Sequence, residues 1–120
     1  MHFATTTTGL LALAAAASAS SVMGTIKMFY DPASDCTGNP VAYEGTGSSL
    51  AVPTDFLDQC QPIPAAVDNH TYERFSASGL TPVFSFELYT DADCQNLATN
   101  VSNVCVPDVA SYIARRVDSK

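Results

Sequence analysis

Four cysteines constrain how this 120-residue chain can fold more than any other feature. They are Cys36, Cys60, Cys94 and Cys105. An even number of cysteines in a short exported chain is typical of disulfide bonds, here two. The alternative is a zinc site of four thiolates, which needs cysteines separated by only two to four residues. None of the four lies so close to the next. We therefore expect two disulfides and no metal.

The first residues are typical of a secretory signal. They carry no acidic side chain, Leu10–Ala17 forms a short apolar core, and Ala17–Ala19 offers the small side chains that signal peptidase accepts. An apolar run this short does not span a bilayer, which needs roughly twenty residues. We predict a signal peptide at residues 1–19 and a single mature domain at residues 20–120, secreted to the extracellular space.

The charge balance narrows the kinds of partner. The chain has five basic and twelve acidic residues, and its net charge is −7. Nucleic acid and anionic lipid repel such a surface. We therefore expect no nucleic-acid partner and no membrane insertion, and the balance argues against a cationic membrane-lytic peptide.

The chain contains two similar segments, MFYDPASDCTGNP and ELYTDADCQN. Each has an aromatic residue, an acidic turn and Asp-Cys in the same order. The similarity continues around the second cysteine of each half. The matched residues are Cys36 with Cys94, Cys60 with Cys105, Tyr30 with Tyr89, Pro62 with Pro107, and Tyr72 with Tyr112. Chance similarity in a sequence of low diversity is the alternative to a true repeat.

A true repeat favours one disulfide pairing. Internal symmetry then places one bridge within each half, Cys36–Cys60 and Cys94–Cys105. The loops would hold about 25 and 12 residues, and each bridge would contribute on the order of 3 kcal/mol by restricting the unfolded chain. That contribution is comparable to the whole expected stability of a domain this small.

Alternating apolar and polar residues indicate an all-β fold. Three segments show the two-residue period of a strand, and turn-forming residues separate them. The side chains expected to share one face are Ile26, Met28 and Tyr30; Phe84, Phe86 and Leu88; and Val109, Ile113 and Val117. No segment has a helical stripe, and residues 50–57 offer a turn or two of helix at most.

The corner that follows the first strand of each half resembles that of the small secreted βγ-crystallin-like proteins of fungi. Each Greek-key motif of that family opens with an aromatic-x4-aromatic-x-Gly corner. Tyr89 and Cys94 have this spacing, with cysteine in place of the second aromatic residue and Asn96 in place of the glycine. The first half keeps Gly38, but Tyr30 lies one residue too far away. The resemblance implies a small disulfide-stapled β-sandwich of two Greek-key-like halves.

Microbial members of that family often bind calcium, but Asp68–Glu73 has Tyr72 and Glu73 where hydroxyl side chains belong. We therefore expect no metal and no cofactor. The segment from Cys94 to Val117 is also similar to the secreted fungal allergen family typified by the Alternaria major allergen, which is all-β and non-enzymatic. Both resemblances imply a secreted fungal protein, some of whose relatives act at a host or microbial surface.

Candidate catalytic groups are few. A Ser-His-Asp or Cys-His site needs a histidine, and only His70 remains after signal removal. Paired carboxylates of the kind that glycosidases use occur twice. The pairs are Asp31 with Asp35 and Asp91 with Asp93. Each pair lies in a predicted turn, where aspartate commonly caps the backbone. We expect no catalytic residue and a protein that is not an enzyme.

Two sequons for N-glycosylation are present, Asn69-His70-Thr71 and Asn100-Val101-Ser102. We expect Asn69 to be the better acceptor of the two. Asn100 would lie within the tight loop that a Cys94–Cys105 bridge closes, so we expect it to carry glycan less readily.

These features together predict a small, secreted, monomeric and non-enzymatic protein, an effector or a surface-binding protein of a fungal secretome. Its expected partner is a host or microbial surface protein or glycan. An antimicrobial or killer-toxin-like protein and a small secreted hydrolase are the alternatives. Tyr43, Phe56 and Tyr112 are candidate contact residues, and the sequence does not select among them.

Overall fold

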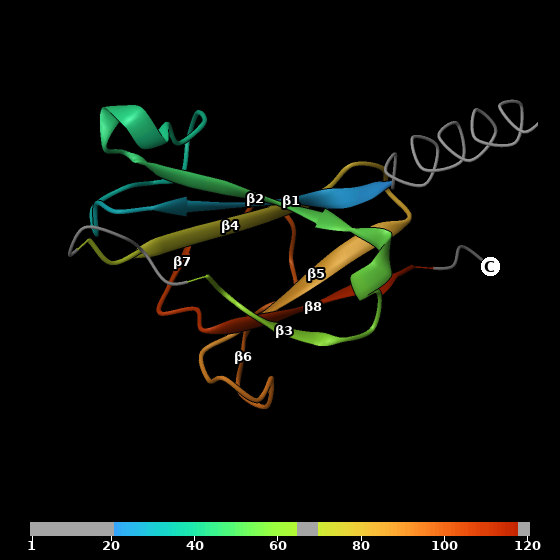
Figure 1. Ribbon diagram of the computed structural model, residues 1–120. Helices are drawn as coiled ribbons and strands as arrows, with labels where there is room; N and C mark the ends of the chain where they lie inside the picture. The colour runs from blue at the N-terminus through green and yellow to red at the C-terminus, as the bar shows by residue number, and fades with distance from the viewer. Residues whose placement is uncertain (1–20, 65–69, 118–120) are drawn as a thin grey trace, which may run out of the picture.

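The computed structural model describes residues 21–64 and 70–117. Within them the chain forms eight strands and two short 3-10 helices (Figure 1). In chain order these are β1 (Val22–Phe29), η1 (Ala42–Glu44), β2 (Gly47–Pro53), η2 (Thr54–Phe56), β3 (Cys60–Pro62), β4 (Arg74–Gly79), β5 (Phe84–Tyr89), β6 (Leu97–Thr99), β7 (Val106–Pro107) and β8 (Ser111–Arg116). The predicted all-β class is confirmed.

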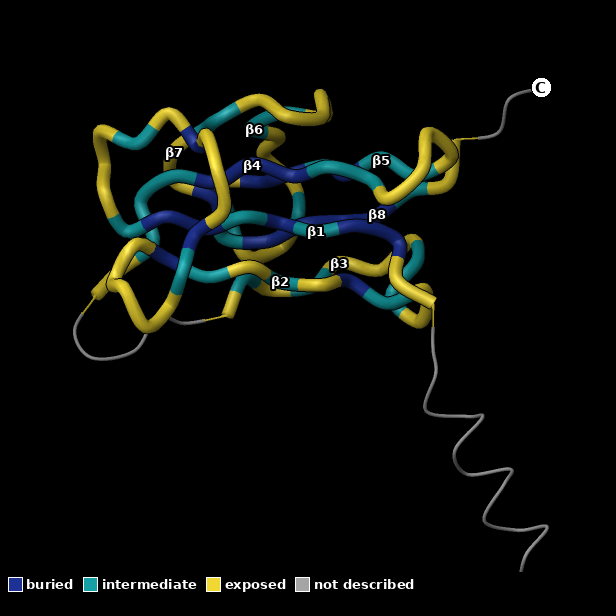
Figure 2. Tube along the Cα trace, turned by 90° about the horizontal axis from the view of Figure 1, so that it is seen from above, coloured by how far each residue is buried: buried dark blue, intermediate teal, exposed yellow. Residues whose placement is uncertain are grey.

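The strands form two antiparallel sheets of four strands each, in the orders β2-β1-β4-β7 and β3-β8-β5-β6. Apolar side chains from both sheets meet in one core. Figure 2 shows the buried stretches of β1, β4 and β8 in dark blue. The buried members of the core are Met23, Ile26, Met28, Val52, Phe75, Ala77, Phe86, Leu88, Val109, Tyr112 and Ala114. Ile26 and Met28 therefore point into the core, as predicted for their strand. Phe86 and Leu88 do so too, as predicted for theirs.

The first four strands and the last four follow the same path. Strands β4, β1 and β2 lie side by side in one sheet, while β3 crosses to the other sheet. Strands β8, β5 and β6 lie side by side there, while β7 crosses back. A Greek key has the spatial order 4-1-2-3. Each half is therefore a Greek key whose third strand has moved into the sheet of the other half.

Backbone hydrogen bonds outside the strand ladders recur in both halves. Glu73 N donates to Phe29 O (2.7 Å), and the corresponding bond runs from Ala110 N to Tyr89 O (2.8 Å). Leu80 N donates to Met23 O (2.8 Å), and the corresponding bond runs from Val117 N to Val83 O (2.6 Å). Asp58 N donates to Ala114 O (2.8 Å), and the corresponding bond runs from Asn103 N to Ala77 O (2.8 Å). Their recurrence at a constant spacing along each strand shows that the halves share one detailed backbone plan.

This register corrects two residue matches that sequence similarity predicts. Phe29, and not Tyr30, is the counterpart of Tyr89, because each ends the first strand of its half. Phe75 is the counterpart of Tyr112, and both side chains are 2% exposed in the core. The cysteine matches are correct, but the turns between them differ in length, so the flanking aromatic residues do not align in the printed sequence.

The predicted face of the last strand is wrong. Tyr112 and Ala114 point into the core, so Ile113 lies on the outer face of β8. Val117 is 46% exposed beyond the end of the strand. Val109 is in the core but precedes β8, so the two-residue alternation does not run through from Val109 into the strand.

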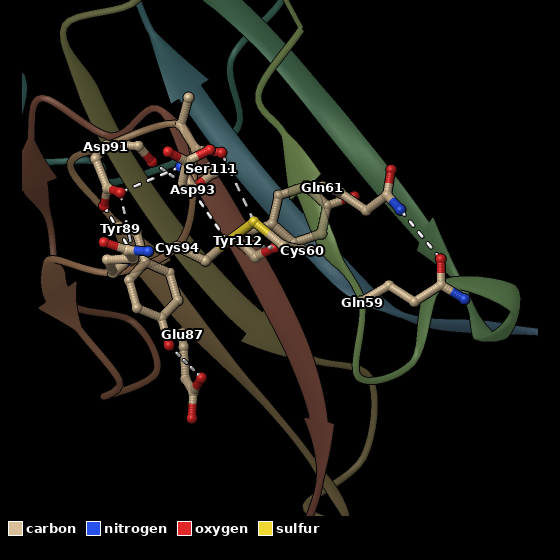
Figure 3. The surroundings of a disulfide bond; sticks show 12 residues. Gln59, Cys60, Gln61, Glu87, Tyr89, Asp91, Asp93, Cys94, Ser111 and Tyr112 are labelled. Carbon is tan, nitrogen blue, oxygen red and sulfur yellow. Dashed lines mark hydrogen bonds between the residues drawn. A yellow bond between two sulfur atoms is a disulfide. The ribbon is translucent and has the colours of Figure 1, made fainter.

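The predicted disulfide pairing is also wrong. The bridges are Cys36–Cys105 and Cys60–Cys94, with Cα–Cα distances of 5.6 and 6.0 Å. Figure 3 shows the second of them, Cys60–Cys94. Because each third strand lies in the sheet of the opposite half, it brings its cysteine to the corner of that half. Two bridges that each join one half to the other are related by the internal symmetry, just as two bridges within the halves would be. Symmetry alone therefore cannot select the pairing, and the strand crossing decides it.

The two corners share the same strained backbone. Cys36 has a φ of 66° and Cys94 has a φ of 56°, which are left-handed values that non-glycine residues adopt rarely. Asp58 and Asn103, each two residues before the second cysteine of its half, have φ values of 62° and 65°. The conformations on both sides of each bridge therefore repeat between the halves.

Candidate functional site

A groove of about 530 Å³ opens where β1 ends. Its walls combine ring and polar side chains from the β1–β2 connection with His70, which precedes β4. The side chains used below are Tyr30, Asp31, Asn39, Glu44 and His70.

Stacked rings connect this groove with the core. Tyr30 stacks on His70 with ring centroids 4.8 Å apart and on Tyr72 with centroids 5.2 Å apart. Tyr72 meets Phe75 edge to face at 6.4 Å, and Phe75 is buried. Aromatic pairs of this kind contribute about 0.5–1.5 kcal/mol each beyond their buried area. The stack therefore holds Tyr30 and His70 in place at the groove surface.

Cationic side chains fix the wall formed by the β1–β2 connection. The Lys27 ammonium donates hydrogen bonds to Cys36 O (3.0 Å) and to Gly38 O (2.7 Å). Arg74 Nε donates to Pro32 O at 2.7 Å. Together with the Cys36 disulfide, these bonds attach the wall to β1, β4 and the other half. A wall held in this way loses little freedom when a ligand binds.

Aspartates in this wall cap their own turns, as the sequence predicts. Asp31 Oδ1 accepts a hydrogen bond from Ala33 N at 2.9 Å. Asp35 Oδ1 accepts bonds from both the hydroxyl (2.7 Å) and the backbone N–H (3.1 Å) of Thr37. The hydroxyl bond is the main reason that the pKa of Asp35 lies below its ordinary value.

The corresponding turn of the second half is built on Asp91. Its carboxylate accepts backbone bonds from Asn96 (2.8 Å) and Gln95 (3.0 Å), and the bond from Asn96 contributes most to lowering the pKa of Asp91. Asp93 N also donates to it, at 3.2 Å. Asp91 therefore organises the loop between β5 and β6.

The ring stack belongs to the first half alone. The repeated register places Thr90 at the counterpart of Tyr30 and Val109 at the counterpart of Tyr72. Residues 90–96 join β5 to β6, whereas residues 30–46 join β1 to β2. The first half therefore carries both the longer connection and the aromatic surface, and this asymmetry separates a candidate site from the shared framework.

A polar network lies on the outer face of the second sheet. Arg115 forms ion pairs with Glu87 (3.2 Å) and Asp58 (3.3 Å), and Tyr89 OH donates to Glu87 at 2.5 Å. The bond to Glu87 is the first cause of the raised pKa of Tyr89. Burial opposes the charge of Arg115, but bonds to Asp58 and Glu87 outweigh it and raise the pKa of Arg115. This network joins β5, β8 and the start of β3, so its place in the fold is structural.

The three candidate contact residues predicted from the sequence lie in different environments. Tyr43 is 90% exposed, Phe56 packs partly against the core, and Tyr112 is buried. Sequence reasoning missed the contact between Tyr30 and His70, because no local pattern signals a stack between residues so far apart in the chain. His70 is exposed, as predicted, but its ring is held by Tyr30.

The remaining predicted features are the two sequons and the signal peptide. Asn100 is exposed in the loop between β6 and β7, whereas Asn69 and the predicted signal peptide at residues 1–19 lie outside the described residues. Among residues 21–64 and 70–117, no group of three or more His, Cys, Asp or Glu side chains is placed to hold a metal ion. In the same part of the chain, no helix has the length and apolarity needed to cross a membrane.

Comparison with known proteins gives no relative. No protein-family model matches the chain, and neither a curated protein nor a solved structure matches it. The fold and cross-links establish a small all-β protein of two four-stranded antiparallel sheets with two disulfides. Such bridges are typical of an oxidising compartment.

Proposed function

We propose that the protein is a secreted, non-enzymatic binding protein of the fungal βγ-crystallin-like type, and that the groove at the end of β1 binds a neutral surface glycan. The observation that carries the proposal is that the stacked rings of His70 and Tyr30 line one groove together with polar groups, while Tyr72 stacks on Tyr30 and supports it. A sugar ring offers an apolar face of C–H groups and an edge of hydroxyl groups. Aromatic rings bind the face, and carboxylate and amide groups bind the edge.

The polar side chains in the groove support this chemistry. Asn39 and Glu44 are exposed and, within the described part of the chain, their side chains make no hydrogen bond. Asn39 can both donate to and accept from a hydroxyl group, and Glu44 can accept. Asp31 adds a second carboxylate to the lining. With a net charge of −7 on the chain, these carboxylates disfavour acidic polysaccharides.

The framework supports a binding role in a second way. The two Greek-key halves agree with the resemblance on which the family proposal rests, and the ring stack occurs in only one of them. A fixed wall beside stacked rings provides a surface that needs little reorganisation. An antimicrobial role is the alternative, and growth assays with the same purified protein test it.

Titration of the purified secreted protein with soluble β-glucan, chitin and mannan oligosaccharides tests the proposal. We expect binding of at least one neutral glycan, with a loss of about tenfold in affinity for Tyr30→Ala, equivalent to about 1.4 kcal/mol. His70→Ala should show a similar loss. Tyr43→Ala removes an exposed tyrosine outside the groove and should bind like the parent protein.

Two controls make this result specific. Each variant should keep the circular dichroism of a folded protein, since Tyr30 and His70 lie outside the core. Tyr30→Ala removes two ring contacts, so its melting temperature should fall although it still folds. A polyanionic polysaccharide should bind more weakly than a neutral one of similar length. Absence of binding to every neutral glycan, or equal losses for Tyr30→Ala and Tyr43→Ala, contradicts the proposal.

A further inference from the structure

The second sequon, Asn100-Val101-Ser102, lies in the loop between β6 and β7, residues 100–105. Sequence reasoning disfavours it because a bridge between Cys94 and Cys105 would close this loop tightly. In the structure, Cys94 is bonded to Cys60 and Cys105 to Cys36. No bridge therefore closes the loop on itself, and the reason for disfavouring Asn100 disappears.

The local geometry leaves the sequon accessible. Asn100, Val101 and Ser102 are all exposed. Within the described residues, the Asn100 side chain makes no hydrogen bond. The loop is anchored beside the sequon, where Thr99 Oγ1 accepts from Val101 N at 3.1 Å and Asn103 N donates to Ala77 O at 2.8 Å. A substituent on Asn100 therefore breaks no hydrogen bond of its side chain to the described residues.

Exposed apolar side chains surround the sequon in the chain. Val101 is 57% exposed, Leu97 51% and Val104 37%. They lie within four residues of Asn100, so the extended chain separates them from it by at most about 14 Å. A large contiguous apolar patch on a protein surface commonly marks a partner or needs cover. These three side chains lie on both sides of Asn100 in the sequence. A glycan is bulky and solubilising, and a sequon in the middle of this group supplies its attachment point.

We infer that Asn100 carries an N-linked glycan that covers Leu97, Val101 and Val104. The donor is a lipid-linked oligosaccharide diphosphate of the secretory pathway. The bond between sugar C1 and the diphosphate oxygen breaks, and a bond between C1 and Asn100 Nδ2 forms. The lipid diphosphate leaves with the electron pair, and Nδ2 gives up one proton. The Ser102 hydroxyl completes the recognition motif.

Expression of the full chain in a eukaryotic secretory host tests the site. We expect a glycosylated product that peptide N-glycosidase converts to a single lower mass, with Asp in place of Asn100. Asn100→Gln and Ser102→Ala should both abolish the modification at this site. Ser102→Thr, which keeps the sequon, should retain it, and Asn69→Gln should leave the peptide containing Asn100 modified. An unmodified Asn100 peptide from the wild-type chain, whether secreted or retained, overturns the inference.

A second measurement tests whether the glycan covers the apolar side chains. Removal of the glycan from the folded protein should raise the fluorescence of a bound apolar dye severalfold. The same treatment of a Leu97→Ser, Val101→Ser variant should raise it much less. The Ser102→Ala protein, which never carries the glycan but keeps Asn100, should bind dye like the deglycosylated wild type. Equal dye binding before and after removal overturns the covering role.

Discussion

Removal of the two disulfides one at a time tests how the exchanged strands are stabilised. The inner bridge is removed by Cys60→Ser with Cys94→Ser, and the outer bridge by Cys36→Ser with Cys105→Ser. Cys60 is exposed, so its replacement removes little packing, whereas Cys36 is 6% exposed. The variant without Cys60–Cys94 therefore measures mainly the effect of the cross-link on stability. The variant without Cys36–Cys105 also loses the packing of the buried Cys36 side chain.

The expected magnitudes follow from the lengths of chain that the bridges close. Sequence separations of 34 and 69 residues correspond to about 3.8 and 4.4 kcal/mol of restricted unfolded-state entropy. The inner bridge already shortens the outer loop to about 36 residues, so loss of the outer bridge alone costs about 3.8 kcal/mol plus its packing. Loss of both costs about 8 kcal/mol, which is enough to unfold many domains of this size.

Urea unfolding followed by far-UV circular dichroism measures these losses. We expect each single-bridge variant to fold with a midpoint well below that of the parent protein, and the variant without both bridges to be unfolded. Because Cys60 is exposed and Cys36 is buried, limited reduction should open the inner bridge first. Losses below about 1 kcal/mol, or a non-reduced peptide that joins Cys36 to Cys60, refute the reasoning.

Two further predictions concern the backbone and the acid limit. Gly24→Ala should lower the free energy of unfolding in urea by about 2–3 kcal/mol, because the new Cβ would overlap Ser78 O and lie 2.7 Å from the Phe86 ring. Gly38→Ala, whose Cβ would meet no atom within 4 Å, should lower it by about 1 kcal/mol because Gly38 has a φ of 71°. Equal losses contradict the close approach at Gly24. The lowered pKa of Asp91 means that its contribution is present above the unfolded value near 3.8 and is lost as the pH falls through the lower folded value. The melting temperature of Asp91→Asn should therefore change less than that of the wild type between pH 5 and 2, and parallel curves would falsify this.

Local sequence patterns were sufficient to predict part of the fold. The two-residue alternation placed Ile26, Met28, Phe86 and Leu88 on core-facing strands, because each of these segments is a continuous strand. The same alternation failed between Val109 and Ile113, because Val109 precedes β8 and Ile113 lies on its outer face. Periodicity is thus informative within a strand and uninformative across its start.

Long-range features were not accessible in the same way. The cysteines of the two halves were matched correctly, but the crossing of β3 and β7 into opposite sheets has no local signature. The stack of Tyr30 and His70 depends on the same tertiary arrangement. Aspartate turns, by contrast, were predictable from the local sequence, because the side chains of Asp31 and Asp91 accept hydrogen bonds from backbone N–H groups shortly after them in the chain.

The nested order of the bridges affects how the molecule responds to proteolysis. Cys36–Cys105 encloses the other bridge and most of the described chain. A protease that cuts the backbone once, anywhere between these two cysteines, leaves two pieces that are still joined through sulfur. Pairing within each half would instead let a cut between Cys60 and Cys94 release two separate fragments. A nick in a surface connection therefore leaves the two pieces of the molecule tethered.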